Sequence, residues 1–452
     1  MTVSARPTIV WFICDDTGFN MLGYTGGPVL TPTIDRIARE GVACSQFHTA
    51  AASCTPSRYA YLTGLYPSRC RASRYLALNP PGVPANASVG VQIQPGDITL
   101  GSLLQDAGYV TGHVGKWHVG SPRAAFHGDY HRDDNLDDPD VARKLREDYA
   151  AMQAEVRNAG FDYAEALAWG DTDSRPLAAL RYHNLEWHTD AALRFLAERN
   201  RDTRPFFLSM ALTTIHGPHH IESLESDGRQ VEWGYLDAMP RVQAPRATVL
   251  SRLDAAPGVA INHQTVGALW MDDAIAAVMA RLDAMGVADN TIVIWSTDHG
   301  PGTIDSKMSC YHGGVHIPLC MRWPGRIPAG STCDALSQNI DFVPTLLSAA
   351  GIAPPPGVAF DGISRWDQLC GAAPDRREDL YFELGRTRAV RTRRWKYLAF
   401  RYTPDEINAM RSGAVPMAFN MVTLPGADFV IHQHPHYFEP DQLYDLERDP
   451  TE

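Results

Sequence analysis

Short apolar runs alternate with amphipathic stretches along most of the 452 residues, and this alternation limits the fold more than any other feature. Apolar runs of strand length occupy residues 9–14, 109–114, 205–211 and 291–295, and helical patterns occupy residues 32–40, 101–107, 189–198, 267–285 and 341–350. Strands that are apolar throughout are buried on both faces, which is typical of a parallel sheet covered by helices. The sequence therefore predicts an α/β fold.

The pattern changes near residue 372, beyond a proline-rich stretch at residues 354–356. Short alternating strands are predicted at residues 379–384, 388–392 and 395–400, which indicates a smaller antiparallel unit. We expect a larger α/β domain over residues 1–371 and a C-terminal subdomain over residues 372–452. The polar, charged segment at residues 121–157 is predicted to be a surface excursion that helps to shape the mouth of a cleft.

Composition argues against several classes of protein. The net charge of -12 argues against nucleic acid as a main partner, because phosphate binding depends on clustered cations. The 8 cysteines include no CxxC spacing, so most are expected to be reduced core residues. No stretch approaches the ~20 apolar residues of a membrane span. As written, the sequence predicts a cytoplasmic protein, or a periplasmic or secreted one if a signal peptide was removed, and it leaves the oligomeric state open.

Polar residues directly follow three of the predicted strands. Asp15-Asp16 and Asp298-His299 each follow a buried strand, and His216 follows a third after a short linker. Ligands bind outside the carboxyl ends of strands in open α/β sheets, so these residues are candidates for one site. Adjacent carboxylates repel each other without a cation, which favours a hard divalent metal; helix capping is the alternative for either pair alone.

A cysteine precedes a proline-punctuated turn at the predicted start of a helix. Cys54 begins the segment Cys-Thr-Pro-Ser-Arg, which places Arg58 one helical turn further on. Free backbone N–H groups and the helix dipole favour an anion at such a position, and an arginine can grip it. Taken alone, a cysteine at a helix start is more often an ordinary thiol.

These features together resemble the sulfatase family. The matching segments are Asp15-Asp16, Cys54-Thr55-Pro56-Ser57-Arg58, Leu62-Thr63-Gly64, Gly115-Lys116-Trp117-His118, Asp298-His299-Gly300, Lys307, Gly313-Gly314-Val315-His316-Ile317-Pro318-Leu319, and Leu443-Tyr444-Asp445-Leu446 with Asp449-Pro450. The matches occur in order and extend over almost the whole chain. Such an ordered set is far more specific than any one motif.

The resemblance implies an alkaline-phosphatase-like fold: a mixed, mostly parallel sheet between helices, with a C-terminal α+β subdomain that contains an antiparallel sheet. It also implies that a maturation enzyme converts Cys54 to Cα-formylglycine, whose hydrated aldehyde is the nucleophile. Ca²⁺ would be bound by Asp15, Asp16, Cys54, Asp298 and His299. Catalytic roles would fall to Cys54, Arg58, Lys116, His118, His216 and Lys307, with His118 or His216 protonating the leaving oxygen.

Some residues depart from the family pattern or are open to a second interpretation. The imidazole of His299 suits Ca²⁺ less well than the three aspartates do. His312 stands where many relatives have a glutamate, which would alter the leaving-group side of the pocket. The cluster around His216 could instead bind zinc, but His219 and His220 are better candidates for lining the substrate pocket. Arg386, in a basic run, could bind a carboxylate or a second sulfate of the substrate.

The sequence thus predicts a sulfuric ester hydrolase acting on a small sulfated substrate, more specifically a sulfated sugar. A phosphonate monoester or phosphodiester hydrolase is the nearest alternative, because a singly charged diester resembles a sulfate monoester. A binding protein for sulfated glycans would be expected to lack one of the catalytic residues, and none is missing. A thiol hydrolase using Cys54 directly would leave both acidic pairs unexplained.

Overall fold

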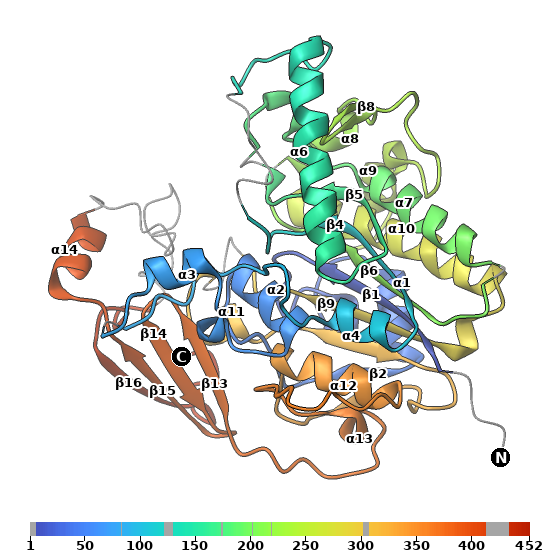
Figure 1. Cartoon of the computed structure of the whole chain (residues 1–452). Helices are drawn as coiled ribbons and strands as arrows, with labels where there is room; N and C mark the ends of the chain where they lie inside the picture. Colours follow the sequence, from blue (N-terminus) through green and yellow to red (C-terminus); the bar gives the residue numbers. More distant parts are fainter. Residues whose placement is uncertain are drawn as a thin grey trace.

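An eight-stranded mixed sheet forms the centre of the molecule (Figure 1). The computed structural model describes residues 6–82, 84–121, 130–172, 175–200, 202–217, 219–301, 307–412 and 434–452. The strand order is β11-β2-β10-β9-β1-β6-β4-β5. The bounds are β1 Thr8–Cys14, β2 Val42–Cys44, β4 Val110–Lys116, β5 Tyr163–Ala168, β6 Phe206–Ala211, β9 Thr291–Thr297, β10 Leu319–Arg322 and β11 Ser331–Cys333.

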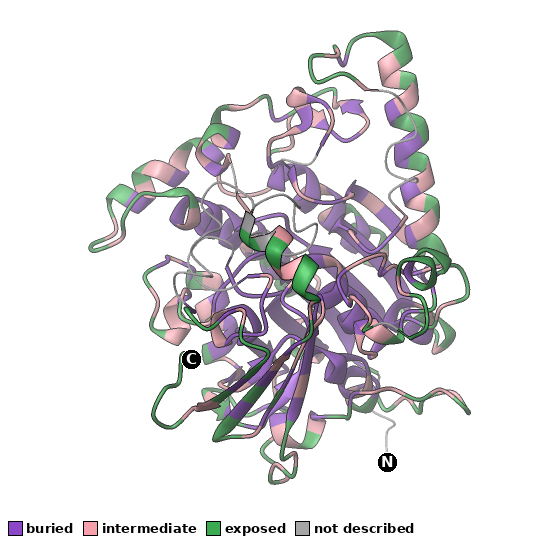
Figure 2. Ribbon diagram, turned by 90° about the vertical axis from the view of Figure 1, so that its left-hand side faces the viewer, coloured by how far each residue is buried: buried purple, intermediate pink, exposed green. Residues whose placement is uncertain are grey.

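The sheet is parallel except at one strand. β1 pairs in parallel with β6 and β9, and β4 pairs in parallel with β5 and β6, whereas β10 runs antiparallel to both β9 and β2. Every residue of β1, β4, β6 and β9 is buried, as Figure 2 shows for the centre of the molecule. The predicted α/β class and the four predicted strands are therefore confirmed.

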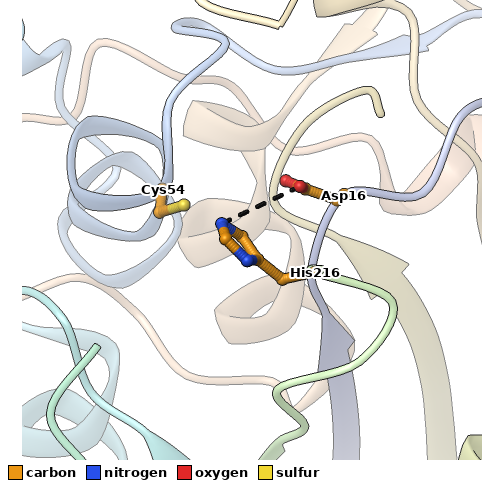
Figure 3. Close-up of side chains that lie close together, drawn as sticks. All are labelled: Asp16, Cys54 and His216. Carbon is orange, nitrogen blue, oxygen red and sulfur yellow. Dashed lines mark ion pairs between the residues drawn. The ribbon is translucent and has the colours of Figure 1, made fainter. Parts of the chain in front are cut away.

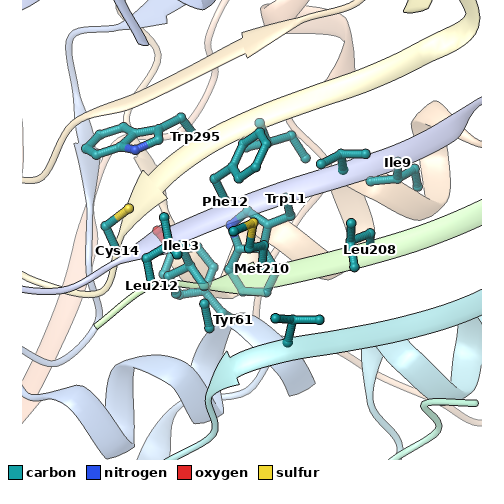
Figure 4. Packing of buried hydrophobic residues seen from close by; sticks show 14 of the residues in the cluster. Ile9, Trp11, Phe12, Ile13, Cys14, Tyr61, Leu208, Met210, Leu212 and Trp295 are labelled. Carbon is teal, nitrogen blue, oxygen red and sulfur yellow. The ribbon is translucent and has the colours of Figure 1, made fainter. Parts of the chain in front are cut away.

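Helices cover both faces of this sheet. On one side α1 (Pro32–Arg39) and α7 (Leu185–Arg199) contact the long helix α10 (His263–Ala284), and on the other α4 (Leu100–Asp106) and α12 (Phe342–Ala349) contact α2 (Cys54–Thr63). Trp11 of β1 packs between Tyr61 and Phe342, with ring centroids 5.2 and 4.6 Å away, within the core drawn in Figure 4. This packing fixes α2 against the central strand.

Helix α6 is the main departure from the predicted secondary structure. It runs from Pro139 to Asn158 through the segment expected to be a surface excursion, of which residues 122–129 lie outside the described part. Charged side chains dominate its sequence, but Leu145, Tyr149, Met152 and Val156 recur once per turn and are buried. That single narrow apolar stripe is the helical signal, and the surrounding charges obscure it.

The C-terminal residues form a four-stranded antiparallel sheet of β13 (Leu380–Leu384), β14 (Thr387–Arg391), β15 (Trp395–Phe400) and β16 (Asp441–Asp445). Three of these strands were predicted, and the antiparallel arrangement is confirmed. Phe382 and Leu398 share an apolar cluster with Ala51 and Tyr311 of the larger unit. The small sheet therefore packs beside the segment that leads into α2.

The remaining elements are short. Their bounds are α3 Ser73–Leu78, α8 His220–Glu225, α9 Val249–Asp254, α11 His312–Val315, α13 Trp366–Leu369, α14 Pro404–Ser412, β3 Phe47–His48, β7 Gln230–Val231, β8 Gly234–Tyr235 and β12 Ser337–Gln338.

All eight cysteines are free thiols, and seven are buried, as expected. Among the described residues no helix has both the length and the apolar character needed to cross a membrane.

Two glycines, one just before β4 and one near its end, allow a test of how closely β4 approaches β6. Gly108 and Gly115 both have positive φ, 88° and 95°, but a Cβ on Gly108 would meet open space while one on Gly115 would lie 1.9 Å from the carbonyl oxygen of Ala211. Gly108→Ala should lower the free energy of unfolding by about 1–2 kcal/mol, the cost of a left-handed residue. Gly115→Ala should cost more, because β6 must also move.

Chemical denaturation of the two variants measures this difference. Gly108→Ala is the matched control, since it imposes the same backbone strain without the collision. Equal destabilisation of the two variants would contradict the close approach of β4 and β6.

Candidate active site

Polar side chains gather where the carboxyl ends of five neighbouring parallel strands meet. They are Asp15 and Asp16 after β1, Lys116 at the end of β4, Asp171 after β5, His216 after β6, and Asp298 and His299 after β9. Because β9, β1, β6, β4 and β5 are consecutive in the sheet, these ends lie at one edge. The sequence predicted every one of these residues except Asp171.

Helix α2 presents Cys54 to this edge. Cys54 is the first residue of the helix, and its Sγ lies 3.2 Å from His299 Nε2. The Ser57 hydroxyl donates to the backbone carbonyl of Asp298 at 2.5 Å, and the Tyr61 hydroxyl donates to the carbonyl of Thr297 at 3.0 Å, so one helix face is bound along the end of β9. Cys54 therefore has a fixed position at a helix N-terminus, where negative charge is favoured.

Arg58 ties this helix to three strand ends. Its guanidinium donates to Asp15 Oδ1 at 2.9 Å, to Asp298 Oδ2 at 3.1 Å and to the carbonyl oxygen of Lys116 at 3.1 Å. The side chains of Arg58, Asp15 and Asp298 are each at most 3% exposed. Such buried ions need partners in good geometry, and here the guanidinium supplies one to each carboxylate.

Two lysines add positive charge around Cys54. Lys116 Nζ donates to Asp15 Oδ2 at 2.8 Å, and Lys307 Nζ donates to Asp16 Oδ1 at 2.7 Å. Burial alone would raise the pKa of the Cys54 thiol, but Lys116 and Lys307 offset this and lower the pKa to about 7. An anionic group at position 54 is thus stabilised by its surroundings.

The carboxylates provide a donor set that suits a hard cation. Asp16 N–H donates to Asp298 Oδ1 at 3.4 Å, and His299 Nδ1 lies 3.4 Å from Asp16 Oδ1. Burial, followed by the charge of Asp15, raises the pKa of Asp298 well above its usual range. A divalent ion at this position would offset both the burial of Asp298 and the charge of Asp15. Carboxylate oxygens fit such an ion, and the imidazole of His299 fits it less well.

Cys54 belongs to every cluster of potential metal ligands among the described residues. In each cluster the possible ligand atoms lie within 4.8 Å of one another. The partners of Cys54 are Asp298 and His299 in one cluster, Asp16 and His216 in a second, and His118 and Asp171 in a third. Figure 3 shows Cys54 and Asp16 on opposite sides of the His216 ring. The candidate nucleophile and the potential metal ligands thus share one small volume.

Two histidines face this volume. His216 Nε2 lies 3.5 Å from Asp171 Oδ1 and 3.9 Å from Asp16 Oδ2, and its Nδ1 contacts the carbonyl of Gly217 at 2.5 Å. Burial lowers the pKa of His216, but the charges of Asp171 and Asp16 raise it above its ordinary value. Burial lowers the pKa of His118 to about 4. His216 is therefore the histidine better suited to hold a proton here.

Asp171 is the site residue that sequence reasoning missed. It follows β5, a strand that was not predicted, because Glu165 interrupts the apolar pattern of the strand. The rule that located the other residues, a polar group after the carboxyl end of a strand, applies to Asp171 as well. Recognition of β5 was the missing step.

The four predicted substrate-binding residues lie in different surroundings. His219 precedes α8 and its ring lies beside Tyr182, while His220 is buried against His183, with ring centroids 4.7 Å apart. His312 lines a cavity of about 470 Å³ together with Phe19 and His316. Arg386, in the turn between β13 and β14, pairs with Glu406 of α14 at 3.0 Å. Their roles stay predictions.

Comparison with known proteins is consistent with this site. A family model described as sulfatase matches residues 7–352, and one described as N-sulphoglucosamine sulphohydrolase, C-terminal, matches residues 301–426. Human arylsulfatase A is 28% identical, over 100% of this chain and 83% of that protein. N-acetylgalactosamine-6-sulfatase from the dog, Canis lupus familiaris, is 27% identical, over 83% of this chain and 68% of that protein.

Solved structures share the fold. A protein solved with its substrate D-glucosamine-2-N,6-O-disulfate superposes with a TM-score of 0.61 at 20% identity, over 99% of this chain and 92% of that chain. The neighbours have the alkaline-phosphatase-like fold, which confirms the expected architecture. Since the sulfatase model spans well over half of the sequence, the chain belongs to the sulfatase family and is a sulfuric ester hydrolase.

Proposed function

We propose that this sulfatase releases inorganic sulfate from a sulfated carbohydrate, using a formylglycine derived from Cys54 and a bound Ca²⁺. The observation that carries the proposal is the position of Cys54 at the start of α2, between Lys116 and Lys307 and beside three buried aspartates. A nucleophile that attacks a negatively charged sulfate ester needs such fixed positive charge around it.

Formylglycine at position 54 would require a maturation enzyme as a partner of the chain. The modified residue supplies a hydrated aldehyde as the nucleophile. The surroundings of Cys54 suit that chemistry, since the helix N-terminus and both lysines favour negative charge there. The same surroundings would serve a thiolate, so the modification needs its own test.

Fixed cations would orient the sulfate group. Lys116 and Lys307 hold their Nζ atoms at the pocket through Asp15 and Asp16, and neither ammonium has to reorganise during the reaction. The Arg58 guanidinium donates hydrogen bonds to two carboxylates and to a backbone carbonyl. We assign Arg58 the role of holding the site together, and Lys116 and Lys307 the role of binding the sulfuryl oxygens.

A proton must reach the leaving oxygen of an unactivated alcohol. His216 presents Nε2 to the pocket and has two carboxylates near it, so it is our candidate for the proton donor. His118 lies beside the same carboxylate of Asp171, with Nδ1 3.9 Å away. We assign it a supporting role in the binding of the sulfate.

Asp15, Asp16 and Asp298 would hold Ca²⁺, with His299 and the modified Cys54 as further ligands. The ion supplies Lewis-acid polarisation of the sulfuryl oxygens when it is bound. The chain contributes three carboxylates on two adjacent strand ends, which is the oxygen-rich donor set that Ca²⁺ prefers.

The carbohydrate part of the proposal is supported by the relatives. One is named for N-acetylgalactosamine 6-sulfate chemistry, and a structural neighbour was solved with a sulfated glucosamine. The cavity lined by Phe19, His312 and His316 adjoins the residues that follow Asp16, and Phe19 stacks on His316 with centroids 4.0 Å apart. Aromatic surfaces with a few polar groups suit a sugar ring.

A panel of substrates tests this function. Matured enzyme should release sulfate from N-acetylgalactosamine 6-sulfate and glucosamine 6-sulfate with a higher kcat/KM than from p-nitrophenyl sulfate, because only the sugars can use the wider cavity. Bis-p-nitrophenyl phosphate should be a poor substrate, and Cys54→Ala, the control, should release nothing from any of them. A higher kcat/KM for the phosphodiester than for every sulfate ester would contradict the proposal.

Metal removal tests the role of the carboxylates. Dialysis against EGTA should lower sulfate release by roughly 10²-fold or more, since one preorganised electrostatic contact to a transition state is worth about that much. Added Ca²⁺ should restore the activity, and Asp298→Asn should need more Ca²⁺ for half-restoration. Asp361→Asn, which removes a carboxylate paired with Arg69 outside the site, is the matched control. Full activity in protein shown to be metal-free by elemental analysis would exclude a catalytic ion.

A further inference from the structure

Asp171 contacts three residues of the candidate site at once. Its Oδ1 accepts a hydrogen bond from Lys116 Nζ and lies 3.5 Å from His216 Nε2 and 3.9 Å from His118 Nδ1. Lys116 also donates to Asp15 Oδ2, so its ammonium lies between two carboxylates. The Asp171 side chain is 22% exposed while that of Lys116 is fully buried. The Asp171 carboxylate therefore forms part of the pocket wall.

The backbone holds Asp171 in this place. The pairing of β4 with β5 shifts register between Val114 and Gly115, where Ala166 has φ of 47°. Beyond this bulge the pairing continues, as Trp117 N–H donates to the carbonyl of Ala168 and His118 N–H donates to that of Trp169, both at 2.8 Å. Bulges of this kind redirect side chains beside active sites.

Gly170 lets the backbone run close to the His118 ring just before Asp171. A Cβ on this residue would lie 3.2 Å from the His118 ring, so a glycine lets the chain pass close to that ring before Asp171. The position of Asp171 is thus set by paired backbone on one side and by close packing on the other. An acidic side chain held so firmly beside a sulfate pocket needs an explanation, because it opposes the charge of the substrate.

We propose that Asp171 is a positioning residue, which holds His216 Nε2 at the pocket for delivery of a proton to the leaving oxygen. This inference rests on the proposed sulfatase function. The bond between sulfur and the ester oxygen breaks as sulfur takes its new bond to the nucleophile at position 54. The electron pair of the broken bond goes to the ester oxygen, which takes the proton from His216 Nε2.

The geometry explains why a carboxylate is needed there. His216 Nδ1 already contacts the Gly217 carbonyl, which leaves Nε2 as the nitrogen that faces the pocket. Nε2 lies 3.5 Å from Asp171 Oδ1 and 3.9 Å from Asp16 Oδ2, so two carboxylates lie within reach of this nitrogen. Asp16 is already bonded to Lys307 through both of its oxygens, at 2.7 and 3.0 Å. Asp171 also accepts from Lys116, but its Oδ1 is the nearer carboxylate oxygen to His216 Nε2, and we assign Asp16 rather than Asp171 to the metal.

The test separates positioning from a general structural effect. The experiment compares wild-type protein with Asp171→Asn and Asp171→Glu, all matured in the same way. For each protein, kcat/KM is measured for sulfate release from p-nitrophenyl sulfate and from phenyl sulfate. The p-nitrophenolate anion leaves readily without a proton, while the more basic phenolate oxygen needs one. Asp171→Asn should lose about tenfold on the first ester and roughly 10²–10³-fold on the second, the range of general acid catalysis.

Two further variants make the result decisive. His216→Ala should show the same unequal loss, and the Asp171→Asn/His216→Ala double variant should lose little more than His216→Ala alone. Asp171→Glu should restore the ratio between the two esters even if its total activity is low. Asp375→Asn, which removes a buried carboxylate paired with Arg365 away from the pocket, is the matched control and should change neither ester.

Each outcome decides the question. Equal losses on both esters in Asp171→Asn, or a rise in KM alone, would overturn the inference and leave the sulfatase function intact. A double variant that multiplies the two single losses would also overturn it, since Asp171 would then act apart from His216. If wild-type protein with a confirmed formylglycine releases sulfate neither from these two esters nor from the two sugar sulfates, the proposed function itself is overturned together with the inference.

Discussion

The buried guanidinium of Arg58 is the contact on which the rest of the site depends. It bridges Asp15 at the end of β1 and Asp298 at the end of β9, and it reaches the backbone of Lys116 at the end of β4. Without it two carboxylates would face each other in the interior, which costs several kcal/mol (~3–5 for a broken buried pair). Arg58 thereby lets adjacent strands end in acidic residues without separating.

This contact also determines where Cys54, the proposed nucleophile, lies. Arg58 is one turn into α2, so the bond that joins the helix to the strand ends leaves Cys54 at the open N-terminus, facing the same edge of the sheet. Packing of Trp11 against Tyr61 and Phe342 holds the opposite end of the helix. One short helix therefore combines an arginine that pairs with two of the proposed metal carboxylates and a residue that the lysines can stabilise as an anion.

Much of the fold and most of the site could be predicted from sequence, for a simple physical reason. Strands buried on both faces, such as β1 and β9, contain a continuous apolar run, and the acidic pairs that follow them mark the carboxyl edge. β5 and α6 lack such a continuous apolar pattern. Glu165 interrupts the strand, and charged residues surround the single apolar stripe of the helix. Asp171 was missed with β5, although the same rule locates it.

Contacts between distant segments were beyond sequence reasoning. The pairing of Lys307 with Asp16 joins residues 291 positions apart, and no local pattern reports it. The same holds for Arg386, whose partner Glu406 lies on α14, next to the small sheet rather than on the strands around Cys54. The resemblance to sulfatases suggested which residues act together, and the fold explains how they can do so.

We propose that this pocket carries a modified Cys54. The most direct measurement is the mass of the tryptic peptide that contains Cys54, taken from protein made in its native host and assayed in parallel for sulfate release. Protein that releases sulfate should give the mass of formylglycine, or of its hydrate, at this position. Fully active protein whose peptide retains an unmodified cysteine would contradict this proposal and point instead to a thiol nucleophile.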